Sequence, residues 1–182
     1  LVGSWIVEMK QGVIENMAPV LTRIFTPLFT VVLAAFLATM MLTSRGIDIQ
    51  REVLIGFDLL LAVVLGLLLY AVSARDPFAP PGPFDVLQLV LVVSALIADV
   101  IALAAIAARI SDFGFTPNRA AALGENLFLL VNLAWSAWLY ARFMRSRAPF
   151  SALERWQTMY LPVYSFWALV VVFVFPLAFA FA

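Results

Sequence analysis

The sequence predicts an all-α polytopic transmembrane helix bundle with about five spans and short amphipathic interfacial helices. Hydrophobic residues make up 65% of the 182-residue chain and charged residues only 12%, whereas a soluble domain is usually about half apolar and a quarter charged. The apolar residues also gather in runs of roughly 20, the length that a helix needs to cross a bilayer. Helices are expected because lipid satisfies no open backbone groups, and because the runs lack the alternation of barrel strands.

The first three spans are expected at residues 19–42, 53–73 and 85–108. The first has the apolar core "PLFTVVLAAFLATMML", and the second reads "VLIGFDLLLAVVLGLLLYAVS". The third follows the proline-rich stretch "DPFAPPGPF", which we interpret as a stiff connecting loop. Asp85 comes shortly after Pro83 and is expected to cap the N-terminus of the third span.

The last two spans are expected at residues 118–143 and 160–182. Residues 2–17 are amphipathic rather than spanning, and we expect them to lie in the membrane interface or to bridge from a preceding helix. A second short amphipathic stretch, "SALERWQTMY" from Ser151, is expected to lead into the fifth span. We treat residues 1–182 as one transmembrane domain. The chain begins with Leu1 and without a signal-peptide pattern, so we expect it to be part of a longer chain.

The charged and reactive residues exclude several classes of function. Eleven basic residues balance eleven acidic ones, so no basic field favours nucleic acid. The chain has no Cys and no His, which removes disulfides, thiol chemistry, His or Cys metal sites and Ser-His-Asp triads. We therefore expect no metal and no cofactor, and we favour a protein that is not an enzyme. The expected partners are the lipid bilayer and other membrane subunits or additional helices of the same chain.

The distribution of Arg and Lys predicts the orientation, because these residues favour the cytoplasmic side. Loops 74–84 and 144–159 fall on one side, and loops 43–52 and 109–117 fall on the other. The first side carries seven basic residues: Lys10, Arg23, Arg75, Arg142, Arg145, Arg147 and Arg155. The second side carries four: Arg45, Arg51, Arg109 and Arg119. We expect a bacterial cytoplasmic membrane with the first side cytoplasmic.

Three acidic residues lie inside apolar runs: Asp58 in the second, Asp99 in the third and Glu125 in the fourth. An acid deep in a bilayer costs at least about 3 kcal/mol unless it is paired, hydrated or protonated, and it usually faces a bundle interior. At 1.5 Å per residue, each lies about 9–15 Å below the nearest loop arginine on the predicted outer side. The three acids are therefore predicted to occupy the same half of the membrane.

Two further patterns accompany these acids. Four alanines of the third span follow a three-to-four spacing that permits close helix approach, and Asp99 borders this stripe: Ala95, Ala98, Ala102 and Ala105. In the fourth span, Glu125, Asn132 and Ser136 fall at i, i+7 and i+11 and form one polar stripe.

Three functional hypotheses follow. The leading one is a permease-like or transport protein with a polar path for protons, cations or a small solute, formed by Asp58, Asp99, Glu125, Asn132 and Arg119. The alternative is a non-catalytic scaffold or partner subunit of a membrane complex, in which the acids pair with arginines or amides and hold the bundle in register. The third is an intramembrane lipid-modifying enzyme.

The stretch "RISDFGFTPNR" between the third and fourth spans contains the residues of a helix start. Gly114 supplies a permissive backbone, and Thr116 before Pro117 predicts an N-cap followed by proline at the first helical position. Arg119 is unusual because a cation near a helix start is electrostatically disfavoured. We expect Arg119 to pair with Asp112, with an acid of another helix or with a lipid phosphate.

This stretch contains an aromatic-Gly-hydrophobic-Thr-x-x-Arg sequence, Phe113 to Arg119, and the last run reads "YLPVYSFWALVVVFVFPLAFAFA". Together they resemble an uncharacterised family of bacterial multi-pass membrane proteins that is sometimes described as permease-like. The resemblance covers residues 109–182 and implies a membrane setting. It implies no particular activity.

Overall fold

The computed structural model describes residues 22–40, 42 and 51–179, and within them it is built from helices without a strand. In chain order the helices are Thr22–Met40, α2 (Arg51–Ala74), α3 (Pro83–Phe113), α4 (Pro117–Met144), α5 (Ser151–Leu169), the π-helical turn η1 (Val170–Val174) and α6 (Phe175–Ala178). Since α5, η1 and α6 are continuous, the described residues contain five helices that are long and apolar enough to cross a membrane. The predicted all-α class is confirmed.

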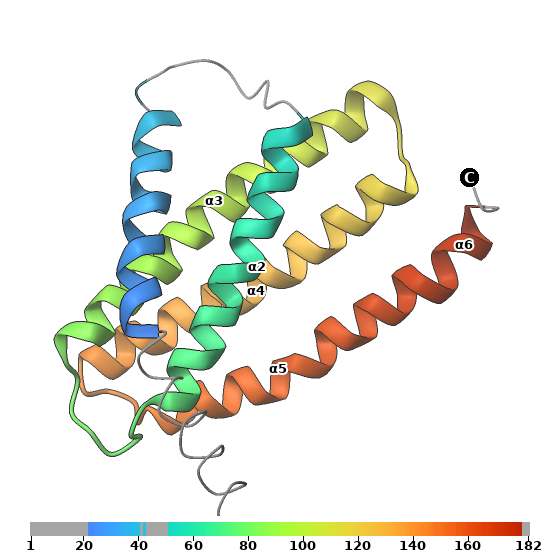
Figure 1. Ribbon diagram of the computed structural model, residues 1–182. Helices are drawn as coiled ribbons and strands as arrows, with labels where there is room; N and C mark the ends of the chain where they lie inside the picture. Colours follow the sequence, from blue (N-terminus) through green and yellow to red (C-terminus); the bar gives the residue numbers. More distant parts are fainter. Residues whose placement is uncertain (1–21, 41, 43–50, 180–182) are drawn as a thin grey trace, which may run out of the picture.

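The centre of the bundle is formed by α3 and α4, which share the most extensive helix–helix contact. The four alanines of α3 are all buried, so their small side chains permit close packing: Ala95, Ala98, Ala102 and Ala105. Figure 1 shows α2 crossing in front of this pair and the Thr22–Met40 helix beside it. The rod formed by α5, η1 and α6 packs on α4 near its start and diverges from the bundle toward its end (Figure 1).

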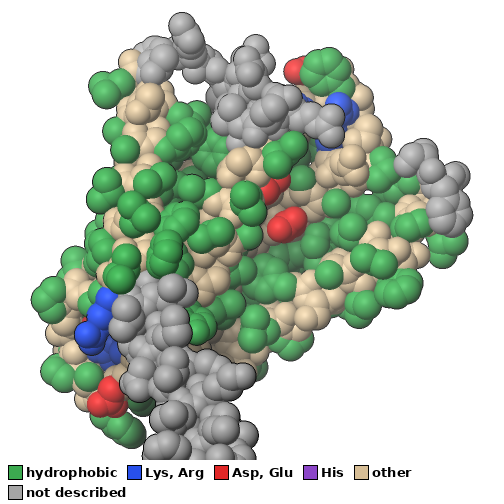
Figure 2. All heavy atoms as spheres, viewed as in Figure 1, with side chains coloured by type: hydrophobic (Ala, Val, Ile, Leu, Met, Phe, Trp, Pro, Cys, Tyr) green, Lys and Arg blue, Asp and Glu red, His purple; other side chains and the backbone are tan. Residues whose placement is uncertain are grey.

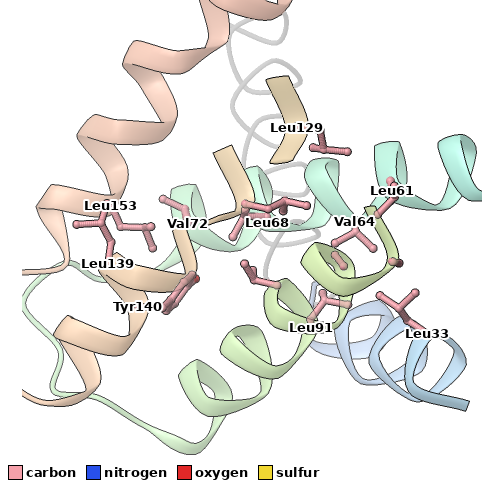
Figure 3. Packing of buried hydrophobic residues seen from close by; sticks show 14 of the residues in the cluster. Leu33, Leu61, Val64, Leu68, Val72, Leu91, Leu129, Leu139, Tyr140 and Leu153 are labelled. Carbon is pink, nitrogen blue, oxygen red and sulfur yellow. The ribbon is translucent and has the colours of Figure 1, made fainter. Parts of the chain in front are cut away.

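The apolar core joins side chains from all five spans. It includes Leu33 of the first helix, Val64 of α2 and Leu91 of α3, as Figure 3 illustrates. Leu133 of α4 and Leu153 of α5 complete it. In a bilayer the lipid tails are as apolar as these side chains, so exclusion of water does not drive the helices together there. Close van der Waals packing stabilises this core instead.

The helix α3 is longer at both ends than the expected 85–108, and Asp85 does not occupy the N-cap. Gly82 is the N-cap and Pro83 takes the first helical position, where its missing N–H costs nothing. The Asp85 carboxylate accepts a hydrogen bond from the Gly82 backbone N–H at 2.8 Å and forms an ion pair with Arg75 at 2.8 Å. A carboxylate in the first turn is favourable there because of the helix dipole.

The fifth span also begins earlier than the expected residue 160, because "SALERWQTMY", which was expected to lead into the span from loop 144–159, forms the first turns of α5. Leu153, Gln157 and Tyr160 are buried, so packing holds these first turns within the bundle. Near the other end, Pro176 follows the π-helical turn η1. A proline clashes with the carbonyl four residues before it, and the wider turn accommodates this clash.

The two ends of the bundle match the two predicted groups of loops. At one end, the Arg75 guanidinium lies over the rings of Phe143 and Phe150 at 4.6 and 4.4 Å, which ties the loop after α2 to the loop after α4 (Figure 1). The turn between α3 and α4 lies at the opposite end (Figure 1). Which end faces the cytoplasm stays a prediction. The expected amphipathic segment 2–17 and most of loop 43–52 lie outside the described residues.

Candidate functional site

Three helices bring the acids of the apolar runs together. Asp58 of α2 interacts electrostatically both with Asp99 of α3 and with Glu125 of α4. The three differ in depth within the bundle, since Asp99 is completely buried, Asp58 is partly buried and Glu125 is exposed. Figure 2 shows acidic side chains in the middle of a mainly hydrophobic face of the molecule. We call Asp58, Asp99 and Glu125, with the neighbouring Asn126, the acid cluster.

Asp99 is the innermost member of the acid cluster. Its exposed fraction is 0%, and neither of its carboxylate oxygens has a hydrogen-bond partner among the described residues. No Lys or Arg in the described part of the chain forms an ion pair with any of the three acids. An enclosed carboxylate without donors is costly in a medium of low dielectric. Asp99 is therefore a group that gains from any added positive charge or hydrogen-bond donor.

Asn126 of α4 binds the acid of α2, although it was not among the site residues predicted from the sequence. Its amide nitrogen donates to the Asp58 carboxylate at 3.0 Å and to the Ala122 carbonyl at 2.9 Å. Its amide oxygen is buried and has no described partner. The signal available in the sequence was an asparagine directly after Glu125 in an apolar run. The depth of Asn126 and its pairing with Asp58 follow only from the packing of α2 against α4.

A second polar group, which we call the amide network, joins α4 to α5. It consists of Asn132, Ser136, Trp156, Gln157 and Tyr164. The Asn132 amide nitrogen donates to Gln157 at 3.2 Å and to the Tyr164 hydroxyl at 3.0 Å. The Asn132 amide oxygen accepts from Trp156 at 2.8 Å and from Ser136 at 3.3 Å, and Gln157 donates to Ser136 at 2.7 Å. The sequence selected Asn132 and Ser136 but not their three partners on α5.

Tyr164 lies between the two polar groups. Its hydroxyl oxygen accepts the hydrogen bond from Asn132, and the side chain also interacts electrostatically with Asp99 and with Glu125. No described residue accepts a hydrogen bond from this hydroxyl group. A phenol can donate and accept at once, so the Tyr164 hydroxyl keeps its donor capacity while it accepts from Asn132.

Close packing of α5 on α4 beside the acid cluster depends on Gly124. A Cβ atom at this position would collide with the ring of Trp167, whose indole nitrogen donates to the Ala121 carbonyl at 3.3 Å. Gly124 precedes Glu125 in the chain, so the Trp167 ring covers the backbone of α4 directly beside this acid.

Arg119 lies apart from the acid cluster and forms no ion pair with Asp112 or with another described acid, so of the expected partners a lipid phosphate stays a prediction. Its guanidinium donates to the backbone carbonyls of Phe113 and Gly114 at 3.0 and 2.8 Å and lies over the Phe113 ring at 5.5 Å. These carbonyls belong to the C-terminal end of α3, where positive charge is favourable. Arg119 is thus tolerated near the start of α4 because its positive charge is stabilised by the carbonyls at the end of α3.

The remaining residues of this turn form its backbone geometry. Gly114 has a φ of +80°, a conformation that glycine adopts without strain. Thr116 is the N-cap of α4, and its hydroxyl accepts a hydrogen bond from the Arg119 backbone N–H at 3.5 Å. Pro117 occupies the first helical position, and Asp112 is exposed. The turn connects two helices without contributing a side chain to the acid cluster.

The acid cluster differs from a metal centre in its geometry. Within the described residues, no three acidic side chains are arranged so that they could hold one metal ion. The carboxylates are near enough to influence one another, but they do not form a shared set of ligands. A single positive charge added to this cluster would thus interact with one or two carboxylates at a time.

The fold and the apolar spans define the class of the protein as a polytopic helical membrane protein, with an acid cluster around the buried Asp99. Comparisons with protein-family models, with curated proteins and with solved structures found no match. The resemblance of residues 109–182 to an uncharacterised multi-pass family stays a prediction.

Proposed function

We propose that this chain is a permease-like transport protein whose acid cluster takes up a proton or a small cation, with Asp99 as the central acid. One observation carries the proposal. Asp99 is completely buried, and both of its carboxylate oxygens lack a partner among the described residues. Intramembrane acids of this kind commonly belong to ion pathways and proton relays.

The charges around Asp99 favour a positively charged ligand. Asp58 adds a second carboxylate within electrostatic range, and no ion pair with a described Lys or Arg offsets it. A proton is the smallest ligand that relieves this repulsion, because it binds one carboxylate and requires no cage of ligands. The absence of a three-acid metal geometry within the described residues supports a proton before a divalent cation.

Two routes toward Asp99 are part of this proposal. On one side, Glu125 is exposed, and Ala121, one turn before it on α4, borders a recess of about 280 Å³ that also touches Phe175 and Phe179. On the other side, Tyr164 links the acids to the amide network. The polar residues of α4 from Glu125 to Ser136 extend over about 16 Å along the helix axis.

The membrane and its sidedness belong to the same proposal. We place the chain in a bacterial cytoplasmic membrane, with loops 74–84 and 144–159 in the cytoplasm. The supporting observation is that four arginines lie at the same end of the bundle: Arg75, Arg142, Arg145 and Arg147. Loops rich in Arg and Lys favour the cytoplasmic side of a membrane.

A flux measurement tests the proposed function. The protein is reconstituted into liposomes that contain a pH-sensitive dye, and proton uptake is followed after an imposed pH gradient and potential. We expect Asp99→Asn to reduce proton flux to that of protein-free liposomes, because asparagine neither binds nor releases a proton at this position. Asp99→Glu should restore part of the flux.

The matched control is Asp112→Asn, which removes an exposed acid from the turn outside the acid cluster. It should leave the flux unchanged. Equal flux for the original chain and Asp99→Asn would contradict the role of Asp99. Flux of the original chain no greater than that of empty liposomes, with protons or with sodium and potassium, would contradict transport itself.

A further inference from the structure

We propose that α2, together with the exposed edge of the acid cluster, docks a transmembrane helix of a partner protein that carries Lys or Arg at the depth of Asp58. This inference goes beyond transport, since it concerns Asp58, Glu125 and the outer face of α2 rather than the protonation of Asp99. The occupant is defined by its chemistry: an apolar helix with one basic side chain about 10 Å below the membrane surface.

The charge at this surface favours a basic partner. Glu125 is exposed and Asp58 is only partly buried, although both lie within spans. No Lys or Arg of the described residues forms an ion pair with either acid. A carboxylate that faces lipid is strongly disfavoured, so charged residues within membranes are usually paired. A basic side chain from a neighbouring helix would satisfy both acids at once.

The shape of α2 below Asp58 favours close contact with another helix. Ala62 and Gly66 follow Asp58 at i+4 and i+8, which places the three residues on one face of the helix. Ala62 and Gly66 are both exposed, and a Cβ atom at Gly66 would meet nothing within 4 Å. A small-xxx-small pair of this kind lets another helix approach the backbone closely. Asp58 therefore lies at one end of a row of small residues that is suited to contact with another helix.

Apolar surface lies on both sides of the acids. On α2, Ile55 and Leu59 have exposed fractions of 58% and 68%. Across the acid cluster, none of the most apolar 18-residue stretch of the last span is buried within the described chain. The end of this span stays in contact with the start of α4 through aromatic side chains, since Trp167 donates to the Ala121 carbonyl at 3.3 Å and the Phe179 ring stacks on Phe115 at 6.1 Å. We expect the additional helix to lie against the outer, apolar faces of α2 and of this span while its basic residue reaches the acids.

A second copy of this chain fits this face less well. In a two-fold symmetric contact the same patch lies on both subunits, so two acid clusters would approach each other. The repulsion between them favours a different chain with the opposite charge. A lipid headgroup is also less suitable, because it would have to descend about 10 Å into the apolar layer to reach Asp58.

A crosslinking experiment with a defined probe tests the docking surface. The protein carries a photoreactive amino acid at Ala62 and is reconstituted into phosphatidylcholine liposomes. The probe is a synthetic Leu/Ala helix of about 23 residues with one Arg about seven residues from its end. The matched control probe has Gln in place of Arg. We expect crosslinking to the Arg probe and at least about tenfold weaker crosslinking to the Gln probe.

Variants of the protein locate the contact. Asp58→Asn combined with Glu125→Gln should weaken crosslinking of the Arg probe to the level of the Gln probe. Gly66→Leu should weaken both probes by blocking close approach. Val90→Leu, an exposed position of α3, should change neither result. Far-ultraviolet circular dichroism and gel filtration confirm that each variant is folded before it is compared.

Several outcomes would overturn the inference. These are equal crosslinking of the Arg and Gln probes, unchanged crosslinking after removal of both acids, and crosslinks only to lipid or to a second copy of the chain. If the original chain carried no flux of protons, sodium or potassium, transport would be contradicted, but the docking surface would not, because the crosslinking measurement does not depend on flux.

Discussion

Two asparagines of α4, six residues apart, have opposite surroundings. Both are buried, with exposed fractions of 2% for Asn126 and 0% for Asn132. The Asn132 side chain makes four hydrogen bonds, to Gln157, Tyr164, Trp156 and Ser136. The Asn126 amide oxygen has no described partner, and within the same acid cluster the fully buried Asp99 has none for either oxygen.

This contrast separates two uses of polar residues within one bundle. The amide network satisfies its donors and acceptors across α4 and α5, which is the pattern of a structural contact that fixes how two helices pack. The acid cluster leaves acceptors without donors although α3 and α4 pack closely around it. Unsatisfied buried groups lower stability, and this cost supports the proposal that the acid cluster binds a ligand rather than holds the helices in place. Substitutions in the two polar groups test this separation.

The largest effect on stability is expected for Asn132→Leu. Leucine is similar in volume but removes four hydrogen bonds, and it leaves the amide oxygen of Gln157 and the indole N–H of Trp156 without these partners. We expect the free energy of unfolding to fall by about 2–3 kcal/mol. Titration with sodium dodecyl sulfate, followed by circular dichroism, measures this change.

The matched control is the same substitution at Asn126. Asn126→Leu removes two hydrogen bonds and a buried acceptor that lacks a partner, so the loss should stay below about 1 kcal/mol. Equal losses for the two variants would contradict the distinction between the amide network and the acid cluster.

A smaller effect, of opposite sign, is expected for Asp99→Asn. The substitution keeps the shape of the side chain but removes the cost of burying a charge that has no donors. We expect the free energy of unfolding to rise by about 1 kcal/mol at neutral pH. The same detergent titration measures it. A clear loss of stability would mean that Asp99 has a structural role like that of Asn132.

Periodicity and hydropathy were sufficient to predict the features that depend on a single helix. The apolar runs predicted the helices, and the spacing of Ala95, Ala98, Ala102 and Ala105 predicted a face for close packing that the structure shows to be buried. Helix geometry also placed Asp58, Asp99 and Glu125 in one half of the membrane. Their mutual proximity could not be derived in this way, because it depends on which helices touch.

Features that depend on two helices were missed for the same reason. Gln157 and Tyr164 gain their roles from the packing of α5 on α4, and Asn126 gains its role from Asp58 of α2. The stretch from Ser151 was predicted to lead into the fifth span because it is amphipathic. In the structure it forms the first turns of α5, with Gln157 buried in the amide network while Ser151, Arg155 and Thr158 are exposed.

The smallest expected effect concerns Arg119, which the sequence grouped with the acids and the structure places at the end of α3. Arg119→Met preserves the length of the side chain and its helix propensity but removes both hydrogen bonds to the carbonyls of Phe113 and Gly114. The unfolding free energy should fall by about 0.5–1 kcal/mol, the usual contribution of a cation at a helix C-terminus. Proton flux in liposomes should not change, because the guanidinium of Arg119 binds the end of α3 rather than the acid cluster.

Arg147→Met, at an exposed position of the opposite loop, controls for the loss of one positive charge and should change neither the unfolding free energy nor the proton flux. If Arg119→Met abolished flux while stability stayed constant, the turn would have to act on the acids through the ends of α3 and α4, and the boundary drawn around the acid cluster would be too narrow.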